Sequence, residues 1–289
     1  MNHPRVGIGL PVFGPHAGPE AVTTIATTAE RLGFHAVSAT ERLLLPAGPD
    51  WHNEAGLPDW PVYDPIETLT WAAAHTRRIR LATGVVDSLF QPPIVLARRL
   101  ATLDRLSGGR VDVGIGQGWL PEEFLAAGVP MSRRGAGFEE HLAAMRACWG
   151  PDPVSHDGPR YRLPRSKVGP KPVHGHLPVY IGGVAQPAIE RAARLADGFV
   201  AALRDWDTTR TEVGWYHAAG GTGPVVLRTF PEWATDGDLA TIGPAAVADL
   251  ERAAAAGVDE LHWDLADVDP RRQVEVLEAV ASALGTLGG

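Results

Sequence analysis

Carboxylates and arginines inside a closed cleft can move protons or hold an anion, and this sequence places both where apolar runs end. Glu41 and Arg42 follow the run at residues 35–40, and Asp87 follows the run at 79–86. A carboxylate facing a closed cleft can have a raised pKa and exchange a proton near neutral pH. Arginine stays protonated, so Arg42 cannot be a general acid or base. We predict a catalytic role for all three, although Asp87 could be a solvated loop residue and Arg42 could simply pair with Glu41.

The segment Gly182-Gly183-Val184-Ala185 could bind a phosphate without any charged side chain. It follows a short apolar run and precedes Pro187, where a helical pattern begins. Exposed N–H groups at a helix N-terminus attract anions. Such a site would suit a chain of formal net charge −8, whose overall field repels anions. The alternative is that the two glycines only turn the chain.

A second glycine-rich segment, Gly116-Gln117-Gly118-Trp119, follows the run at residues 110–115. Glycine lets the backbone approach a ligand closely, and tryptophan offers a flat apolar wall. We therefore predict ligand contacts here, the alternative being the packing of small residues in a layer of the core.

Three further side chains are candidates for contact with a substrate. Arg228 lies in the apolar run at residues 225–229 and could grip a substrate or a cofactor tail, or form a salt bridge at the rim. Trp51 and Trp60 belong to a proline-rich loop at residues 45–64. They could wall a substrate pocket or pack the loop against itself.

Composition excludes several classes of protein. The single cysteine, Cys148, rules out an internal disulfide framework. No run reaches the roughly 18 apolar residues that cross a bilayer, and the N-terminus lacks the pattern of a secretory signal. No basic tract is longer than a pair, which disfavours nucleic acid and anionic membranes as partners. We expect a cytoplasmic protein that acts on a small molecule.

The common motifs of other enzyme classes are missing from the sequence. There is no HExxH pattern, and the pair His174 and His176 has no matching third ligand, so we expect no metal site. There is no GxSxG elbow of a serine hydrolase. The N-terminal GIGLPVFG does not have the GxGxxG spacing of a dinucleotide fingerprint.

The candidate residues lie at the ends of predicted strands in a regular alternation of strands and helices. Eight such units in series predict a closed parallel (β/α)8 barrel (a TIM barrel) and one domain over residues 1–289. The predicted strands are residues 5–10, 35–40, 79–86, 110–115, 178–181, 199–202, 225–229 and 260–264. The predicted helices are residues 19–32, 65–75, 92–106, 137–149, 187–195, 208–219, 244–256 and 270–284. A long excursion at 150–177, with a hairpin around Tyr161, follows the fourth helix. Active sites of such barrels lie at the carboxyl ends of the strands.

Three stretches of the chain resemble the bacterial-luciferase-like superfamily. They are AERLGFHAVSATERLLLP, the long segment in which LATLDRLSGGR leads to GQGWLPEEF, and PVYIGGVAQPAIERAARLADGFV. The sequences of GQGWLPEEF and of the third stretch are similar to those of the actinobacterial branch that uses coenzyme F420, a 5-deazaflavin. The C-terminal third resembles the family only in its alternation of strands and helices.

The resemblance implies an oxidoreductase that binds coenzyme F420 or FMN, and a homodimer. It implies cofactor contacts at Thr83, Gly84 and Val85, with a non-proline cis bond between the last two, and further contacts at the two glycine-rich segments. The chain departs from the family at two positions. Arg42 stands where relatives carry a histidine, which puts the reaction in doubt, and Gln117 stands where bacterial luciferases carry a phosphate-binding arginine.

Three functions are compatible with this sequence. The leading hypothesis is hydride transfer between coenzyme F420 and a small organic substrate. The second is an FMN-dependent monooxygenase that uses reduced flavin and oxygen. The third is a flavin-binding barrel without catalytic activity, which the replaced histidine makes plausible.

Overall fold

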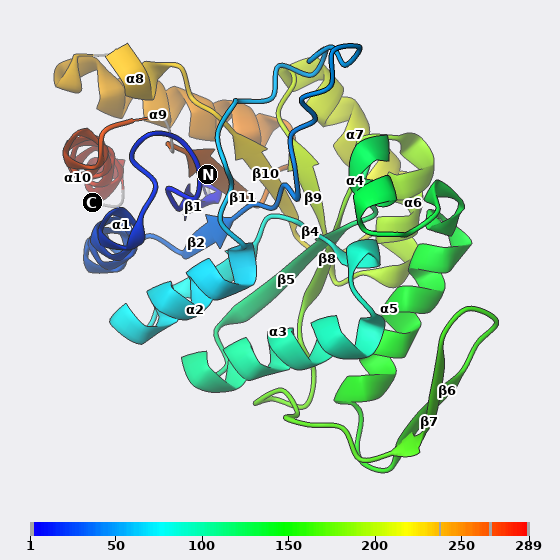
Figure 1. Ribbon diagram of the computed structural model, residues 1–289. Helices are drawn as coiled ribbons and strands as arrows, with labels where there is room; N and C mark the ends of the chain where they lie inside the picture. Colours follow the sequence, from blue (N-terminus) through cyan, green and yellow to red (C-terminus); the bar gives the residue numbers. More distant parts are fainter. Residues whose placement is uncertain (1–2, 237, 266–267, 288–289) are drawn as a thin grey trace.

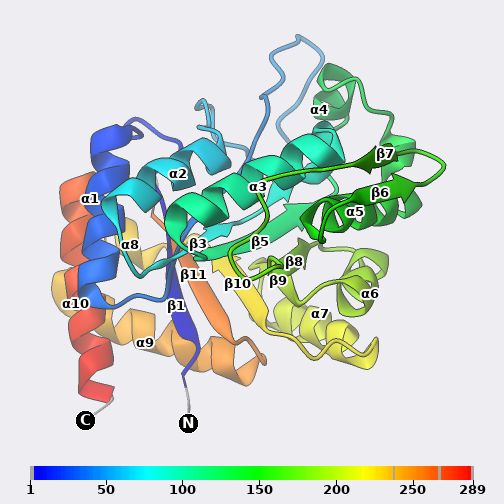
Figure 2. The ribbon, with the colours of Figure 1, turned by 90° about the horizontal axis from the view of Figure 1, so that it is seen from below.

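A closed barrel of eight parallel strands forms the centre of the protein (Figures 1 and 2). The computed structural model describes residues 3–236, 238–265 and 268–287. Around the barrel the strands are β1 (Arg5–Gly9), β2 (Ala36–Ala39), β3 (Arg80–Thr83), β5 (Val111–Gly116), β8 (Val179–Gly182), β9 (Gly198–Ala202), β10 (Val225–Thr229) and β11 (Glu260–Asp264). Pairing of β1 with β11 and of β3 with β5 closes the ring, which confirms the predicted (β/α)8 fold.

Helices surround the barrel and cover its apolar outer face (Figure 2). They are α1 (Pro19–Leu32), α2 (Pro65–His75), α3 (Pro93–Ser107), α5 (Ala136–Trp149), α6 (Gln186–Leu195), α7 (Trp206–Ala218), α9 (Leu239–Ala255) and α10 (Pro270–Leu287). Proline at the start and glycine at the end give several of these helices their bounds. Gly33 and Gly108 end α1 and α3 at φ angles of 83° and 73°, a conformation that favours glycine.

Two predicted bounds are corrected. Helix α9 begins at Leu239 and not at Pro244, because the Asp238 side chain accepts a hydrogen bond from the N–H of Ala240 and caps the helix earlier. The strand predicted at 79–86 is interrupted after Thr83, and pairing with β5 resumes only in β4 (Val86–Asp87).

A hairpin, short helices and 3-10 turns lie outside the strands of the barrel. The hairpin predicted around Tyr161 is confirmed as β6 (Val154–Asp157) and β7 (Arg162–Ser166), which projects beside α5 in Figure 2. Four short elements were not predicted: the helices α4 (Pro121–Ala126) and α8 (Trp233–Asp236), and the 3-10 turns η1 (Ser88–Phe90) and η2 (Met131–Arg133). Within the described ranges, no helix has the length and apolar character required to cross a membrane.

Close contact between β3 and β5 depends on a glycine. A Cβ atom added at Gly114 would lie 2.1 Å from the backbone oxygen of Thr83. The hydroxyl of Thr83 in turn donates a 2.7 Å hydrogen bond to the carbonyl of Gly114. Only glycine lets the end of β3 lie this close to β5.

We predict opposite effects on stability for the same substitution at two glycines. Gly114→Ala should lower the free energy of unfolding by about 1–3 kcal/mol or more, because two backbone segments must separate. Gly214→Ala, within the exposed face of α7 and with no atom within 4 Å of the added Cβ, should raise it by about 0.5–1 kcal/mol. Chemical denaturation followed by circular dichroism measures both. A Gly114→Ala variant as stable as the parent would contradict the contact with Thr83.

Candidate functional site

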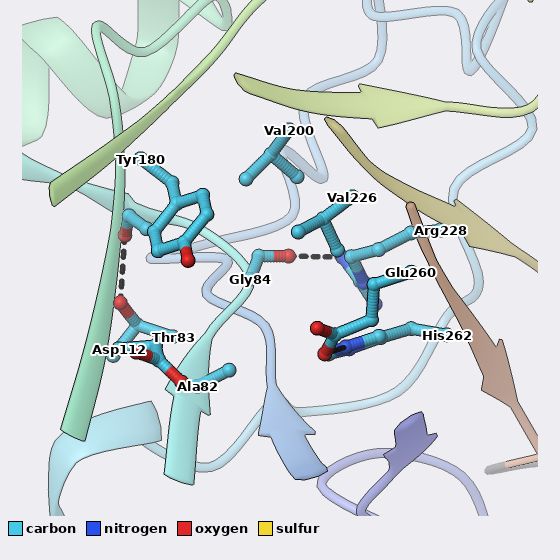
Figure 3. Close-up of a pocket in the computed structure, with 11 residues that line it drawn as sticks. Ala82, Thr83, Gly84, Asp112, Tyr180, Val200, Val226, Arg228, Glu260 and His262 are labelled. Atoms are coloured by element: carbon cyan, nitrogen blue, oxygen red, sulfur yellow. Dashed lines mark hydrogen bonds and ion pairs between the residues drawn. The ribbon is translucent and has the colours of Figure 1, made fainter. Parts of the chain in front are cut away.

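A cleft opens at the carboxyl ends of the strands, with about 1000 Å³ of empty space that includes its open mouth. It brings together every predicted cofactor-binding residue except Thr83, together with Glu41, Asp87 and Arg228. The residues that line it are Thr40, Glu41, Gly84, Val85, Asp87, Gly116, Gln117, Gly118, Trp119, Arg134, Gly182, Gly183, Val184, Ala185, Ala188, Val200, Ala201, Ala202 and Arg228. Thr83 lines a smaller cavity deeper in the barrel (Figure 3).

The segment from Gly84 to Asp87, which we call the platform, forms the floor of the cleft. The bond between Gly84 and Val85 is cis, as predicted. The methyl groups of Val85 occupy space that side chains on neighbouring strands would otherwise take. A Cβ atom added at Gly114, Gly116 or Gly182 would lie 3.3, 2.9 or 3.0 Å from them. The glycines that the sequence marked for close approach to a ligand therefore also make room for Val85.

Glu41 and Asp87 meet beside the platform. Glu41 Oε2 accepts a 2.6 Å hydrogen bond from the N–H of Asp87, and Asp87 Oδ1 accepts one of 2.9 Å from the N–H of Gly118. Burial raises the pKa of Glu41 to about 8 and the pKa of Asp87 to about 6. The negative charge of Glu123 raises the pKa of Asp87 further. Both carboxyls can therefore exchange a proton near neutral pH, and Glu41 holds its proton more tightly than Asp87.

Glu123 is a buried carboxylate of α4 that the sequence did not single out. Glu123 is only 2% exposed. Its Oε1 accepts hydrogen bonds of 2.7 and 3.2 Å from the N–H groups of Leu43 and Leu44. Burial raises its pKa as well. The sequence shows it only as one of two adjacent glutamates in the segment PEEF, and nothing local distinguishes a buried carboxylate there from an exposed one.

Arg42 lies outside the lining of the cleft and does not pair with Glu41. Its Nη1 donates a 2.6 Å hydrogen bond to the carbonyl of Pro58, and its Nη2 donates to the carbonyl of Trp60. The guanidinium thus holds the loop at residues 45–64, which Figure 1 shows as a long connection without regular structure between β2 and α2. Trp51 and Trp60 also lie outside the lining, and Trp60 is 42% exposed.

At the turn before α6, backbone N–H groups that line the cleft could bind an anion. Within the described chain, no acceptor takes the backbone N–H groups of Val184 and Ala185, which precede helix α6, whereas the N–H of Gly183 faces Val200 in the ladder between β8 and β9. A Cβ atom at Gly183 would lie 2.7 Å from the Cβ of Ala188, so this turn is packed tightly onto the helix. Free N–H groups at a helix N-terminus fit the phosphate of a flavin or deazaflavin cofactor.

Arg134, which the sequence analysis missed, adds a positive charge to this cleft. The described residues supply its guanidinium with no hydrogen bond and no ion pair, and it lines the cleft from the turn before α5. The side chain of Gln117 accepts a 2.7 Å hydrogen bond from the N–H of Gly135 and so fixes the neighbouring residue of the chain. A basic pair next to a glycine was the only signal in the sequence.

Arg228 reaches the platform from the far side of the barrel (Figure 3). Its Nη1 donates to the carbonyl of Gly84, and its Nη2 donates a 2.7 Å hydrogen bond to Oδ2 of Asp264. Below it, His262 Nε2 and Glu260 Oε1 are 2.6 Å apart. In the part of the chain that the structure covers, no group of three or more His, Cys, Asp or Glu side chains is placed to hold a metal ion.

Known proteins with similar sequences relate this barrel to a family. The profile of the family described as luciferase-like monooxygenase matches residues 5–261. An uncharacterised protein of Mycobacterium tuberculosis (strain ATCC 25618 / H37Rv) is 40% identical over 209 residues, which cover 69% of this chain and 73% of that protein. An F420-dependent glucose-6-phosphate dehydrogenase of Amycolatopsis mediterranei (strain U-32) is 28% identical over 200 residues, covering 67% of this chain and 56% of the dehydrogenase.

A solved structure agrees over the whole chain. The crystal structure of monooxygenase RslO1 from Streptomyces bottropensis matches with a TM-score of 0.75 and 25% identity, covering 99% of this chain and 100% of that one. The fold, the cleft at the carboxyl ends of the strands and the family profile agree with the predicted resemblance. This chain belongs to the luciferase-like monooxygenase family.

Proposed function

We propose that this protein is a coenzyme F420-dependent oxidoreductase that moves hydride between the deazaflavin and a small organic substrate. The observation that carries the proposal is the pair of buried carboxyls beside the platform, each held by one backbone N–H and with its pKa raised towards neutral pH by burial. Hydride transfer to a carbonyl or from an alcohol requires a proton to move as well, and such a pair serves either direction. Similarity to an F420-dependent relative supports the choice of cofactor.

Each carboxyl keeps one oxygen for the substrate. Within the described residues, Glu41 Oε1 and Asp87 Oδ2 have no hydrogen-bond partner, since backbone N–H groups occupy the other oxygens. In the reductive direction Glu41 would donate its proton to the substrate oxygen. In the oxidative direction Asp87 would accept the hydroxyl proton. The bound cofactor supplies the hydride chemistry, and the chain supplies orientation and the proton.

The cofactor would lie with its ring on the platform and its phosphate at the turn before α6. Val85 and Trp119 would pack against the ring, because both line the cleft and are apolar. The N–H groups of Val184 and Ala185 and the guanidinium of Arg134 would hold the phosphate.

The charges in the part of the cleft beside Glu41 and Asp87 favour an uncharged substrate. Glu41, Asp87 and nearby Glu123 are acidic, whereas the donors of Arg42 are occupied by the loop and two donors of Arg228 by Gly84 and Asp264. Among the described residues that line the cleft, Arg134 keeps its donors free, and the cofactor phosphate would take them, so a phosphorylated substrate would meet mainly carboxylates. We therefore expect an alcohol or a carbonyl compound.

An FMN-dependent monooxygenase is the second candidate. It is supported by the monooxygenase RslO1, which matches this chain along its full length. Assembly as a homodimer and a cytoplasmic location stay predictions.

The cofactor can be identified by titration. We expect the purified protein to bind coenzyme F420 more tightly than FMN, as measured by the change in cofactor fluorescence on binding. Tighter binding of FMN would favour the monooxygenase, and binding of neither would contradict both functions.

The phosphate site can be tested with variants that differ by one N–H group. Ala185→Pro should weaken FMN binding by about ten- to a hundredfold, because a donor to a charged acceptor is lost. Ala185→Val is the matched control, since it enlarges the side chain at the same place and keeps the N–H. Arg134→Gln should weaken binding of FMN and leave that of riboflavin, which has no phosphate, unchanged. Equal losses for riboflavin and FMN would place the phosphate elsewhere.

The carboxyl pair predicts the pH dependence of turnover. Loss of the Glu41 proton should lower the rate of reduction as the pH rises through about 8, and protonation of Asp87 should lower the rate of oxidation as the pH falls through about 6. Glu41→Gln and Asp87→Asn keep the hydrogen-bond acceptors and should each slow the matching direction by about a hundredfold or more. Rates that keep the parent's pH profile in both variants would exclude the pair.

Stability gives a readout of Glu41 that needs no cofactor. A folded-state pKa above the ordinary value of 4.5 means that the folded protein binds more protons than the unfolded chain. The contribution of Glu41 to stability is therefore lost as the pH rises from 4.5 to about 8. Denaturation of Glu41→Gln should show that the variant gains stability relative to the parent over this interval. A constant difference across it would contradict the raised pKa.

A further inference from the structure

We propose that Arg228, oriented by Asp264, is a positioning residue that fixes the platform beneath the cofactor ring and does not grip the substrate. The positioning of the platform is a claim about the protein alone. Only its consequence for the cofactor rests on the proposed function.

The contact between Arg228 and the platform crosses the inside of the barrel. Arg228 lies on β10 and Gly84 follows β3, and these two strands are not neighbours in the ring. Asp264 ends β11, the strand beside β10. One guanidinium therefore joins the end of β3 to the opposite wall, as Figure 3 shows.

The pair is built into the barrel and is not a salt bridge at its rim. The side chains of Arg228 and Asp264 are 14% and 2% exposed. Glycines make room for both of them. A Cβ at Gly84 would lie 3.1 Å from Arg228 Cδ, and a Cβ at Gly9 would lie 2.9 Å from Asp264 Cγ.

The platform is held at several points along its length. The carbonyl of Gly84 lies at its first residue, at the end opposite to Asp87. Val85 rests on the glycines of β5 and β8, the N–H of Asp87 binds Glu41, and its carboxylate binds the N–H of Gly118. Among the described residues, the hydrogen bond to the Gly84 carbonyl comes from Arg228. The N–H of Gly84 donates a 2.8 Å hydrogen bond to the carbonyl of Ala39. Losing the contact with Arg228 should therefore loosen the peptide between Gly84 and Val85 while the rest of the platform stays anchored.

Arg228 also separates two spaces. It lines both the cleft and the deeper cavity of about 370 Å³ of empty volume, together with Gly84 and Val200. Its planar fork presents two donors at a fixed angle, one to a carbonyl and one to a carboxylate, and a lysine ammonium cannot reproduce this arrangement.

Hydrogen exchange of the full-length protein without cofactor tests the positioning directly. In Arg228→Met, amides in the peptide covering residues 84–90 should exchange about tenfold faster, the factor expected for loss of one hydrogen bond to a charged group. Arg228→Lys should give a smaller increase. Arg80→Met is the matched control, because Arg80 pairs with Asp112 at the start of β3 and does not line the cleft. It should leave this peptide unchanged.

Binding of FMN and of coenzyme F420 supplies the second readout. If Arg228 positions the ring, the absorption spectrum of the bound cofactor should shift in Arg228→Met and return towards that of the parent in Arg228→Lys. With a substrate, kcat should fall more than KM rises. A rise in KM alone, with an unchanged spectrum and unchanged exchange at residues 84–90, would overturn the proposal and make Arg228 a substrate-binding residue.

The outcomes separate this inference from the proposed function. If the parent protein binds neither cofactor, the proposed function fails, whereas the exchange experiment still decides whether Arg228 holds the platform. If Arg228→Met does not fold, Asp264→Asn keeps an oxygen beside the guanidinium while removing the charge that orients it. Faster exchange at residues 84–90 in that variant supports the proposal, and unchanged exchange overturns it.

Discussion

The site depends on close packing at the carboxyl end of β3, where the platform passes within contact distance of two neighbouring strands. A barrel of eight strands has an interior just wide enough for side chains, so a segment that turns inward needs space that other residues give up. Gly114, Gly116 and Gly182 give up this space to Thr83 and Val85. The packing that shapes the floor of the cleft is thus the same packing that closes the barrel between β3 and β8.

Placement of charge follows from the same geometry. The chain is acidic overall, yet an anionic cofactor fits because its donors are local, whether backbone N–H groups before α6 or the single guanidinium of Arg134. The carboxyls line the same cleft, where burial and the charge of neighbouring carboxylates raise their pKa values. Arg134 opposes this shift at Asp87, so the cation that would hold the phosphate also acts on one carboxyl of the pair.

Much of the fold could be predicted from the sequence because each unit carries local signals. Apolar runs of strand length alternate with helices that begin at proline and end at glycine, and these signals do not depend on distant residues. The errors lie where a distant or unusual contact decides. The β3 strand was predicted as continuous because residues 79–86 are mostly apolar, whereas in the structure it ends at Thr83 and pairing with β5 resumes at Val86. Helix α9 was predicted to begin at Pro244 because proline favours the first turn, but the cap at Asp238 lies earlier.

For the site, too, the sequence is informative where local signals decide and uninformative where distant contacts decide. Both glycine-rich segments could be found because glycine at a strand end has a local meaning, and both line the cleft. The direction of a long side chain has no such local signal. Arg42 was placed in the cleft by its position after β2, but its partners are carbonyls in an irregular loop whose path the sequence does not encode by periodicity. Arg134 reaches the cleft because Gln117 holds the turn beside it, a contact between segments that only the folded chain brings together. A long cation near a strand end is therefore weak evidence for a site until the acceptors around it are known, and in this barrel those acceptors assign Arg42 to the loop, Arg228 to the platform and Arg134 to the cleft.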